Sequence, residues 1–345
     1  MNDRSFFLSI FFPNYMFYYF HIKLYYIIRR RASMIKYFYQ AKLRRLLAFK
    51  DAPEYLQHNP YILHGYRGYL TTKLLYSGGR TETINIWSHI FGWMLFFGLT
   101  LYDLCLLNIH APFGDKVIVA LLLICFQVCM ILSSVYHTFS CRSEKDYWCF
   151  LSFDLFGIAL SLLSIYMSGV YYAFLDLQKF ILVTVLVIFL FAMILQIPKL
   201  NVNGNVKLVV FVAWAVYGVL PTLHWSIAMG GMDNPIVRLL LPRVLGMYTI
   251  SGLAFAIYLT KIPERFLPGW VDYVGSSHQW WHALVVLALY YWHNTVPRFS
   301  MECACAMEMN FAWLALQKQL SSYNFDEGIA SVCFLENPFK IYMKE

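Results

Sequence analysis

The chain has 345 residues, of which 60% are apolar, 19% are aromatic and only 13% are charged. This composition leaves too little polar surface for a soluble domain of this length, so it predicts a polytopic membrane protein. The net charge of +8 falls in the loops and the N-terminal arm, where Lys and Arg orient membrane spans, and we do not interpret it as a nucleic-acid signal.

The N-terminal region, residues 1–83, is basic and aromatic. Its first part, residues 5–28, contains polar interruptions and ends at Arg29-Arg30-Arg31, so a cleaved signal peptide fits poorly. It is either a signal-anchor span or an interfacial arm, and we favour the arm. Residues 35–50 combine apolar and basic residues at helical spacing and predict an amphipathic helix. This helix either lies on the cytosolic leaflet or offers a docking surface to a cytosolic partner.

Residues 84–295 contain seven apolar runs that are long enough to cross a bilayer. They predict an all-α integral membrane protein with a seven-transmembrane-helix bundle, followed by a tail at 296–345. The sixth run is the shortest, and Pro242 suits the start of its helix. The runs are Ile84–Leu107, Val117–Thr138, Tyr147–Phe174, Phe180–Ile197, Leu208–Met229, Leu245–Thr260 and Ser276–Thr295.

Basic residues set the orientation of the bundle. The stretch from Arg29 to Arg80 contains 11 Lys or Arg residues before the first span, which predicts a cytosolic N-terminus. Seven spans then place the C-terminal tail in the lumen or outside the cell. A cytosolic N-terminus argues against a rhodopsin-like receptor, and the absence of a repeated half argues against a transporter.

Histidines gather at one predicted depth. His278 and His282 are four residues apart, so they lie on one face of the last helix and could hold a metal ion together, or could simply be packed. The predicted orientation brings His137, at the end of the second span, and Asp154, two turns into the third, into the same cytosolic leaflet. Ser133 lies one helical turn before His137, either as a hydrogen-bonding neighbour of the site or as packing between helices.

Other polar residues have plainer interpretations. We interpret His89 as a packing or headgroup residue, Glu82 as a helix-start charge and Asp103 as an outer-leaflet contact. His293 lies 15 residues beyond His278, too far along a helix to bind the same ion. Eight cysteines occur with no CxxC pair, so the sequence predicts neither a zinc ribbon nor a disulfide framework.

The chain resembles the progestin and adipoQ receptor family, which includes the adiponectin receptors. The zinc-site pattern of that family is similar to Ser133-x-x-x-His137, Asp154 and His278-x-x-x-His282. Further similarity covers about Asn59 to Asn294. It includes the motifs Asn59-Pro60-Tyr61-Ile62, Glu82-Thr83-Ile84-Asn85-Ile86-Trp87-Ser88-His89, Tyr136-His137-Thr138-Phe139 and Ile262-Pro263-Glu264-Arg265-Phe266.

The resemblance implies a seven-helix receptor-like fold whose orientation is opposite to that of G-protein-coupled receptors. It implies zinc (Zn²⁺) held by His137, His278 and His282, with Asp154 holding the zinc-bound water. It further implies a ceramidase-like hydrolysis of a ceramide-like membrane lipid, and an extracellular or lumenal ligand.

The segment Pro221-Thr222-Leu223-His224-Trp225 is most similar to a Golgi-resident member that traps a Raf-type kinase. This similarity favours the Golgi membrane, with the plasma membrane as the alternative. Two interpretations therefore stay open. The protein is either a zinc-dependent lipid amidohydrolase, or a Golgi scaffold that holds a Raf-type kinase at residues 1–83, regulates MAP kinase signalling and uses zinc only as a structural ion.

Overall fold

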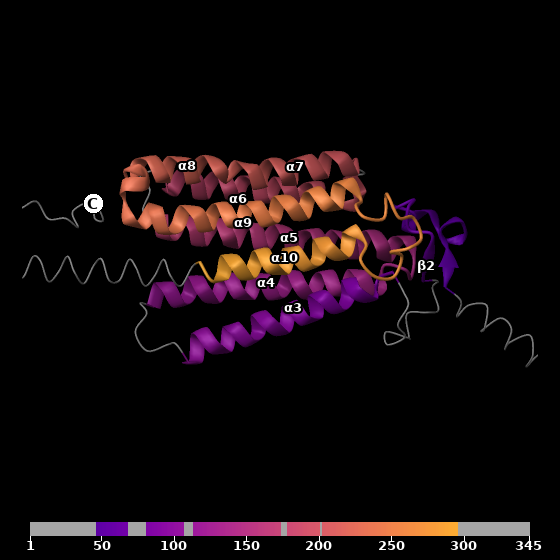
Figure 1. Cartoon of the computed structure of the whole chain (residues 1–345). Coiled ribbons are helices and arrows are strands. Elements are labelled where there is room, and N and C mark those ends of the chain that lie inside the picture. Colours follow the sequence, from indigo (N-terminus) through magenta and orange to yellow (C-terminus); the bar gives the residue numbers. More distant parts are fainter. Residues whose placement is uncertain (1–45, 68–80, 107–112, 174–177, 201, 296–345) are drawn as a thin grey trace, which may run out of the picture.

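The fold is a bundle of long helices with a small β structure at one end (Figure 1). The computed structural model describes residues 46–67, 81–106, 113–173, 178–200 and 202–295. The long helices are α3 (Thr83–Leu101), α4 (Phe113–Phe139), α5 (Glu144–Ala173), α6 (Gln178–Leu195), α7 (Gly204–Tyr217), α8 (Val219–Ala228), α9 (Pro235–Thr260) and α10 (Ser277–His293). The short elements are β1 (Leu47–Ala48), η1 (Phe49–Asp51), η2 (Glu54–Leu56), β2 (His64–Tyr66), the π turn η4 (Tyr102–Leu106), η5 (Pro198–Leu200) and η6 (Gly231–Asp233).

Most of these helices are apolar enough to cross a membrane. Five segments of the described chain meet the length and composition of a span: α3 with the start of η4, α4, α5, α7 with α8, and α9. A shorter apolar helix covers Lys179–Leu195, and α10 has 17 residues. The chain is therefore a helical membrane protein, while the count of seven spans and the side on which each terminus lies stay predictions.

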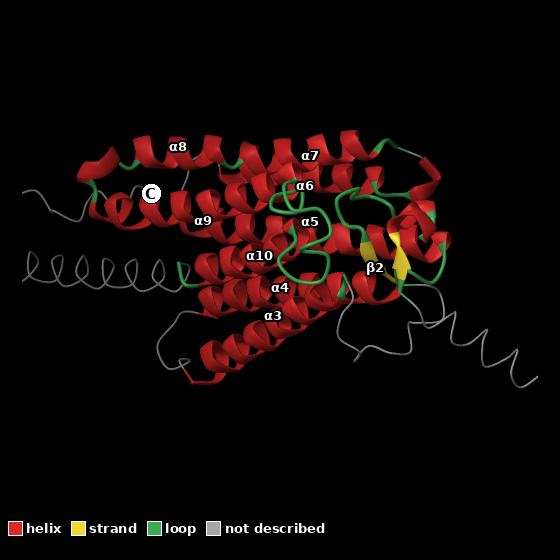
Figure 2. Ribbon diagram, turned by 45° about the vertical axis from the view of Figure 1, so that its right-hand side comes forward, coloured by secondary structure: helices red, strands yellow, loops and turns green. Residues whose placement is uncertain are grey.

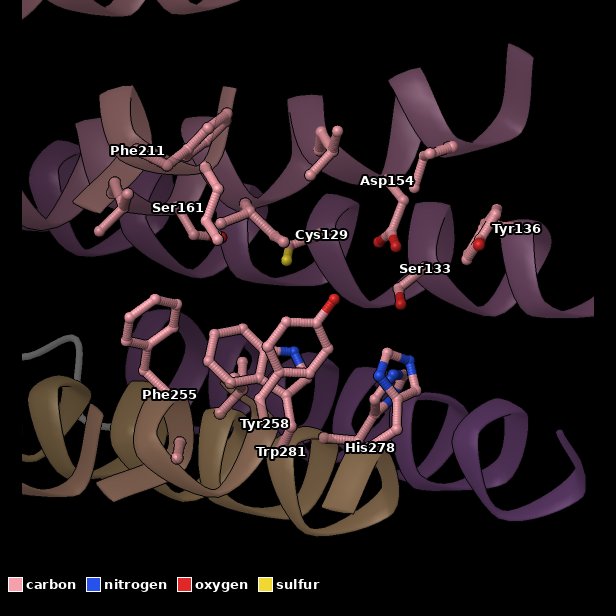
Figure 3. Close-up of a pocket in the computed structure, with 18 of the residues that line it drawn as sticks. Cys129, Ser133, Tyr136, Asp154, Ser161, Phe211, Phe255, Tyr258, His278 and Trp281 are labelled. Carbon is pink, nitrogen blue, oxygen red and sulfur yellow. The ribbon is translucent and has the colours of Figure 1, made fainter. Parts of the chain in front are cut away.

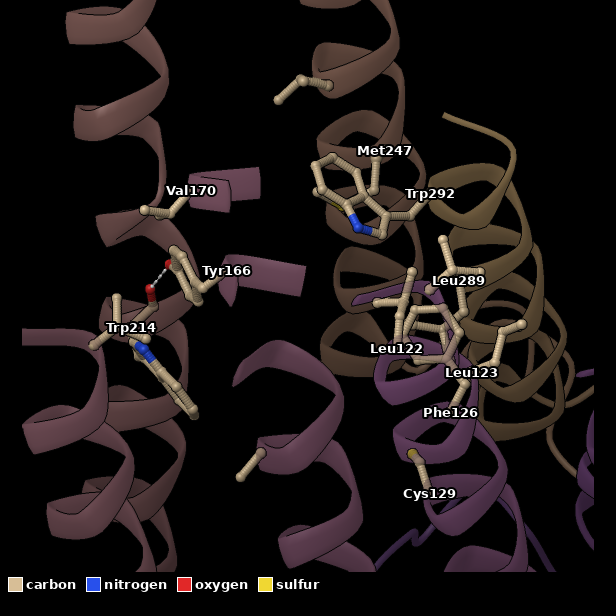
Figure 4. Packing of buried hydrophobic residues seen from close by; sticks show 14 of the residues in the cluster. Leu122, Leu123, Phe126, Cys129, Tyr166, Val170, Trp214, Met247, Leu289 and Trp292 are labelled. Atoms are coloured by element: carbon tan, nitrogen blue, oxygen red, sulfur yellow. Dashed lines mark hydrogen bonds between the residues drawn. The ribbon is translucent and has the colours of Figure 1, made fainter. Parts of the chain in front are cut away.

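The core lies where α4 packs between α3 and α5, and where α10 packs against α9 and α3. Figure 4 shows Leu122, Leu123 and Phe126 of α4 facing Leu289 and Trp292 of α10. These side chains are buried, whereas many large apolar side chains on the outer faces of the helices are exposed. That exposed apolar surface suits contact with lipid acyl chains.

Polar side chains mark several helix starts. The Ser143 hydroxyl accepts from the backbone N–H of Asp146 (3.0 Å) before α5, and the Asn203 side chain accepts from Asn205 N (2.9 Å) before α7. Each contact satisfies one of the backbone N–H groups that lack a partner in the first turn. These side chains fix where the helices begin.

The sixth predicted span differs from the prediction. α9 begins at Pro235 rather than near Pro242, because Asn234 accepts a hydrogen bond from Ile236 N (2.8 Å) and proline suits the first helical position. Pro242 lies inside the helix. Arg238, which precedes the predicted run, is part of α9. Its charge lowers the hydropathy of the first turns, so the apolar run in the sequence begins later than the helix.

The fifth predicted span is divided at Gly218 into α7 and α8. A side chain at Gly218 would overlap the hydroxyl groups of Tyr248 and Tyr166. The Tyr166 hydroxyl donates to the carbonyl of Trp214, which lies one helical turn before Gly218 (Figure 4). A glycine is therefore required where these tyrosines approach the backbone.

Residues 46–67 form a compact structure that we name the β-cap. β1 pairs antiparallel with β2, with Leu47 opposite Tyr66, over a small cluster that includes Ala52 and Ile62. The predicted helix over residues 35–50 is wrong for residues 47–50, which form β1 and part of η1, because pairing with β2 and the following Pro53 oppose a helix there. Residues 35–45 lie outside the described residues, as do the predicted arm and tail.

The β-cap is anchored to the loop between α9 and α10, residues 261–276, which we name the α9–α10 loop (Figure 2). The buried Asp272 carboxylate accepts from the backbone N–H groups of Leu63 (3.0 Å) and His64 (2.8 Å). The β-cap and this loop are thus one connected unit at the same end of the bundle.

A buried pair joins η4, directly after α3, to α10 at the opposite end of the bundle. His293 Nε2 lies 2.6 Å from Asp103 Oδ2, and both side chains are almost fully buried. This pairing agrees with the interpretation of Asp103 as a polar contact, and it accounts for His293 without a metal.

We predict that Asp103→Asn lowers the thermal stability of the purified protein, because removal of one partner of a buried pair costs about 3–5 kcal/mol. The measurement is thermal unfolding in detergent, with the exposed Asp233→Asn as control. Equal melting temperatures for the two variants would contradict the prediction.

Candidate metal centre

The first turn of α10, which carries His278, is held by a carboxylate from the α9–α10 loop. Glu264 is fully buried and accepts from the backbone N–H of Ser277 (2.7 Å), from the Ser277 hydroxyl and from Asn59 Nδ2 (3.0 Å). A carboxylate at a helix N-terminus satisfies free N–H groups and faces the positive end of the helix dipole. Glu264 therefore sets where α10 begins, and with it the position of His278 and His282 along the bundle axis.

Three imidazoles from two helices converge next to this turn. His278 Nε2 lies 3.4 Å from His137 Nε2, and one ring nitrogen from each of His137, His278 and His282 can be chosen so that all lie within 4.8 Å of one another. His137 and His282 are buried, and His278 is half-buried. This cluster could hold a metal ion.

The outer face of His137 contacts a carboxylate that sequence reasoning did not include in the site. His137 Nδ1 lies 2.7 Å from Glu82 Oε2, and the same oxygen accepts from Asn85 Nδ2 (2.8 Å). A proton on Nδ1 leaves the Nε2 lone pair facing His278. We interpreted Glu82 from the sequence as a helix-start charge. Glu82, Asn85 and Ser88 follow one another at intervals of three residues, so they lie near one face of the helix. Ser88 Oγ lies 3.4 Å from His282 Nδ1, and this spacing was the signal in the sequence that could have placed Glu82 near the site.

Charge around Glu82 favours its ionised form. Desolvation alone would raise the pKa of the carboxyl group, but the neighbouring His137, together with His278 and Arg67, holds the pKa of Glu82 below its usual value. An ionised Glu82 is a strong acceptor for the Nδ1–H of His137.

Arg67, directly after β2, holds the end of α4. Its guanidinium is buried and donates to the carbonyl of His137 and to that of Thr138 (3.2 Å). The last carbonyl groups of a helix lack partners within the helix, and a cation there also suits its dipole. The β-cap thereby positions His137, just as the α9–α10 loop positions His278.

Asp154 and Ser133 face the cluster from the other wall of the pocket (Figure 3). Asp154 is buried on α5, with the Ser133 hydroxyl as its hydrogen-bonding neighbour and His137 within electrostatic range. Gly157 makes this possible, because a Cβ there would lie 2.9 Å from the Cα of Cys129 on α4. The group of converging metal-binding side chains contains the three histidines and not Asp154. Asp154 is therefore a neighbour of the candidate metal site and not one of its ligands.

Two further histidines have different positions. His89 is buried and stacks on His282 with ring centroids 3.9 Å apart, so it supports the orientation of that ring. His224 is exposed on α8 and is not part of the cluster.

A large cavity opens from the cluster into the bundle. Its volume is about 1780 Å³, and its lining is mainly apolar. Figure 3 shows Tyr258, Trp281 and Phe255 along one wall, with Cys129 and Ser161 on the other. The histidines, Asp154 and Ser133 thus lie at one end of a space that could hold an acyl chain.

The chain matches known proteins across this whole region. Residues 78–293 match the haemolysin-III-related family. The mouse progestin and adipoQ receptor family member 3 is 43% identical over 263 residues, which cover 73% of this chain and 85% of that protein. The Caenorhabditis elegans progestin and adipoQ receptor-like protein 1 is 31% identical over 267 residues, covering 73% and 60%. The Drosophila melanogaster adiponectin receptor protein is 28% identical over 280 residues, covering 75% and 62%.

We predict that purified protein carries about one metal ion per chain, because three converging imidazoles offer three nitrogen ligands. Replacement of His278 and His282 by alanine removes these ligands and should abolish the metal. Elemental analysis of both proteins provides the measurement, and His224→Ala, an exposed histidine of α8, is the matched control that keeps its metal. Well-folded wild-type protein without metal would contradict the assignment.

We also predict that Glu82→Gln weakens metal binding about 10–100-fold, because loss of the carboxylate behind a histidine ligand lowers the basicity and order of the ring. Competition with a chelator measures this affinity. The control is Glu54→Gln, an exposed glutamate of the β-cap, and an unchanged affinity in Glu82→Gln would show that this carboxylate does not support the ligand.

Proposed function

This chain belongs to the progestin and adipoQ receptors of the haemolysin-III-related family, and we propose that it is a receptor-like intramembrane zinc hydrolase of ceramide-like lipid amides. We further propose seven spans with a cytosolic N-terminus, which would place the cluster in the cytosolic leaflet of an internal membrane, the Golgi being favoured. One observation carries the proposal: three imidazoles converge beside a buried carboxylate at the end of a lipid-sized cavity.

One pair of histidine nitrogens has the spacing that a zinc ion needs, and the three chosen nitrogens lie within 4.8 Å of one another. A tetrahedral zinc ion holds imidazole nitrogens at about 2.0–2.1 Å, which sets two such nitrogens about 3.4 Å apart. His137 Nε2 and His278 Nε2 are separated by 3.4 Å. Three histidine ligands without a fourth protein ligand are typical of catalytic rather than structural zinc sites.

The residues around the cluster suit amide hydrolysis. A zinc ion bound by these histidines would polarise an amide carbonyl as a Lewis acid and lower the pKa of water to about 7. Asp154 would accept a proton from the attacking water as general base and return it to the departing amine nitrogen. The Ser133 hydroxyl would orient the Asp154 carboxylate.

The cavity supports a lipid as the substrate. Its volume of about 1780 Å³ exceeds the roughly 300–1,000 Å³ of pockets that bind drug-sized ligands. Apolar side chains such as Phe255 and Trp292 line it, and the histidines and Asp154 contribute polar groups to the same lining. A lipid amide would place its chain among the apolar residues and its carbonyl at the histidines.

The second candidate function is a Golgi membrane scaffold that holds a Raf-type kinase, with zinc as a structural ion. The similarity to progestin and adipoQ receptor family member 3 and the basic residues of the N-terminal region support it. A closed structural site would need the same histidines, but it would have no use for Asp154 beside them. The two functions use different parts of the chain and can coexist.

We predict that Asp154→Asn lowers hydrolysis of a ceramide-like amide by about 10²–10⁴-fold, the usual contribution of a general base, while metal content and melting temperature are kept. Fatty-acid release from purified protein in lipid vesicles gives the rate. His282→Ala should lose both metal and hydrolysis.

Deletion of residues 35–45 separates the two functions, because it leaves the β-cap and the cluster intact. It should abolish capture of a Raf-type kinase and leave hydrolysis unchanged. Wild-type protein that holds metal but hydrolyses no lipid amide would contradict the hydrolase and favour the scaffold.

A further inference from the structure

Exposed aromatic and aliphatic side chains gather on the α9–α10 loop. Trp270 is 87% exposed, Phe266 is 71% exposed and Val274 is 68% exposed, and Ile262, Leu267 and Tyr273 add to the same apolar surface. A contiguous exposed apolar surface of this kind marks an interaction site for protein, ligand or membrane.

Hydrogen bonds on the inner side of the loop keep its apolar side chains on the outer side. The loop turns its polar atoms inward: Glu264 binds Ser277 and Asn59, and Asp272 binds the backbone of the β-cap. The Gly269 N–H donates to the carbonyl of Tyr61 (3.2 Å). Because the polar groups are satisfied inside, the apolar side chains have no place in the interior and must face outward.

The neighbouring surface indicates what covers these side chains. The two helices that the loop connects also expose large apolar side chains, among them Leu253 and Leu259 on α9 and Trp280 and Leu287 on α10. α9 is one of the helices suited to span a membrane, so these side chains belong to the lipid-facing surface of the bundle. The loop lies at its end, where acyl chains give way to headgroups.

The composition of the loop fits that boundary. Tryptophan is enriched at membrane interfaces, where its ring contacts the acyl chains and its N–H reaches water or headgroups. Arg265 is exposed next to Phe266 and can reach lipid phosphates.

We propose that the α9–α10 loop is an interfacial anchor, with Phe266, Trp270 and Val274 inserted among the headgroups and upper acyl carbons of the leaflet nearest the histidine cluster. Arg265 binds phosphate in the same layer. The anchor acts on the site through Glu264, which joins the loop to the start of α10. Asp272 and Ser276 of the loop also line the cavity, so the anchor positions the cavity mouth against the lipids that enter it. The anchor does not depend on which reaction, if any, the cluster performs.

The test uses the full chain in phosphatidylcholine vesicles that contain phosphatidylserine. An environment-sensitive fluorescent amino acid is placed at position 270 and, as a matched water-facing control, at exposed Glu54 of the β-cap. We expect brominated lipids to quench position 270 strongly and position 54 weakly. Aqueous iodide should give the opposite order, with severalfold weaker quenching at position 270.

A second labelling position controls for a local change of structure caused by the fluorophore. The same fluorophore at position 266 should show the lipid pattern, and metal content identical to wild type shows that α10 is still in place. Iodide quenching at positions 266 and 270 that equals quenching at position 54 would overturn the anchor. That result would mean that the surface is free in water, as a docking site for a cytosolic protein would be.

Discussion

Buried charged side chains at one end of the bundle hold the helix termini that carry the histidines. Glu264 is fully buried, yet its carboxylate is matched by the backbone N–H of Ser277, the Ser277 hydroxyl and the amide of Asn59. Arg67 is buried in the same way against the last carbonyls of α4. An unpaired charge at either place would be costly, so the β-cap, the α9–α10 loop and the two helices must adopt one joint arrangement.

The candidate site follows from this arrangement. α10 contributes two histidines from one face, α4 contributes His137 at its last turn, and α5 contributes Asp154 where Gly157 lets the two helices approach closely. Glu82, directly before α3, completes the shell by contacting His137. The site therefore draws on α4, α5, α10 and the start of α3, and the α9–α10 loop positions the first turn of α10 through Glu264.

The parts of the site that repeat at helical spacing could be predicted from the sequence. His278 and His282 follow the four-residue rule, and alternating helix directions bring His137 and Asp154 to the same depth. The motifs also indicated the family, which the comparisons confirm. Glu82 and His137 are 55 residues apart in sequence, so local spacing could not identify Glu82 as the partner of His137.

Other features depend on pairing or on local chemistry that hydropathy does not report. In the β-cap, Leu47 pairs with Tyr66, and this tertiary pairing overrides the helical pattern at residues 47–50. The start of α9 is set by Asn234 and Pro235, while Arg238 breaks the apolar run that would have revealed it. The outward turn of Trp270 likewise follows from which loop groups are satisfied inside.

The attachment of the β-cap to both ligand-bearing helices has a thermodynamic consequence. Arg67 contacts the end of α4, and Asn59 contacts Glu264, which in turn holds the start of α10. A molecule that binds better when the β-cap is displaced would therefore change the affinity of the three histidines for a metal ion. Linkage requires that the ion change the affinity of that molecule by the same factor. The occupancy of a metal ion at the three histidines and the position of the β-cap would thus report on one equilibrium.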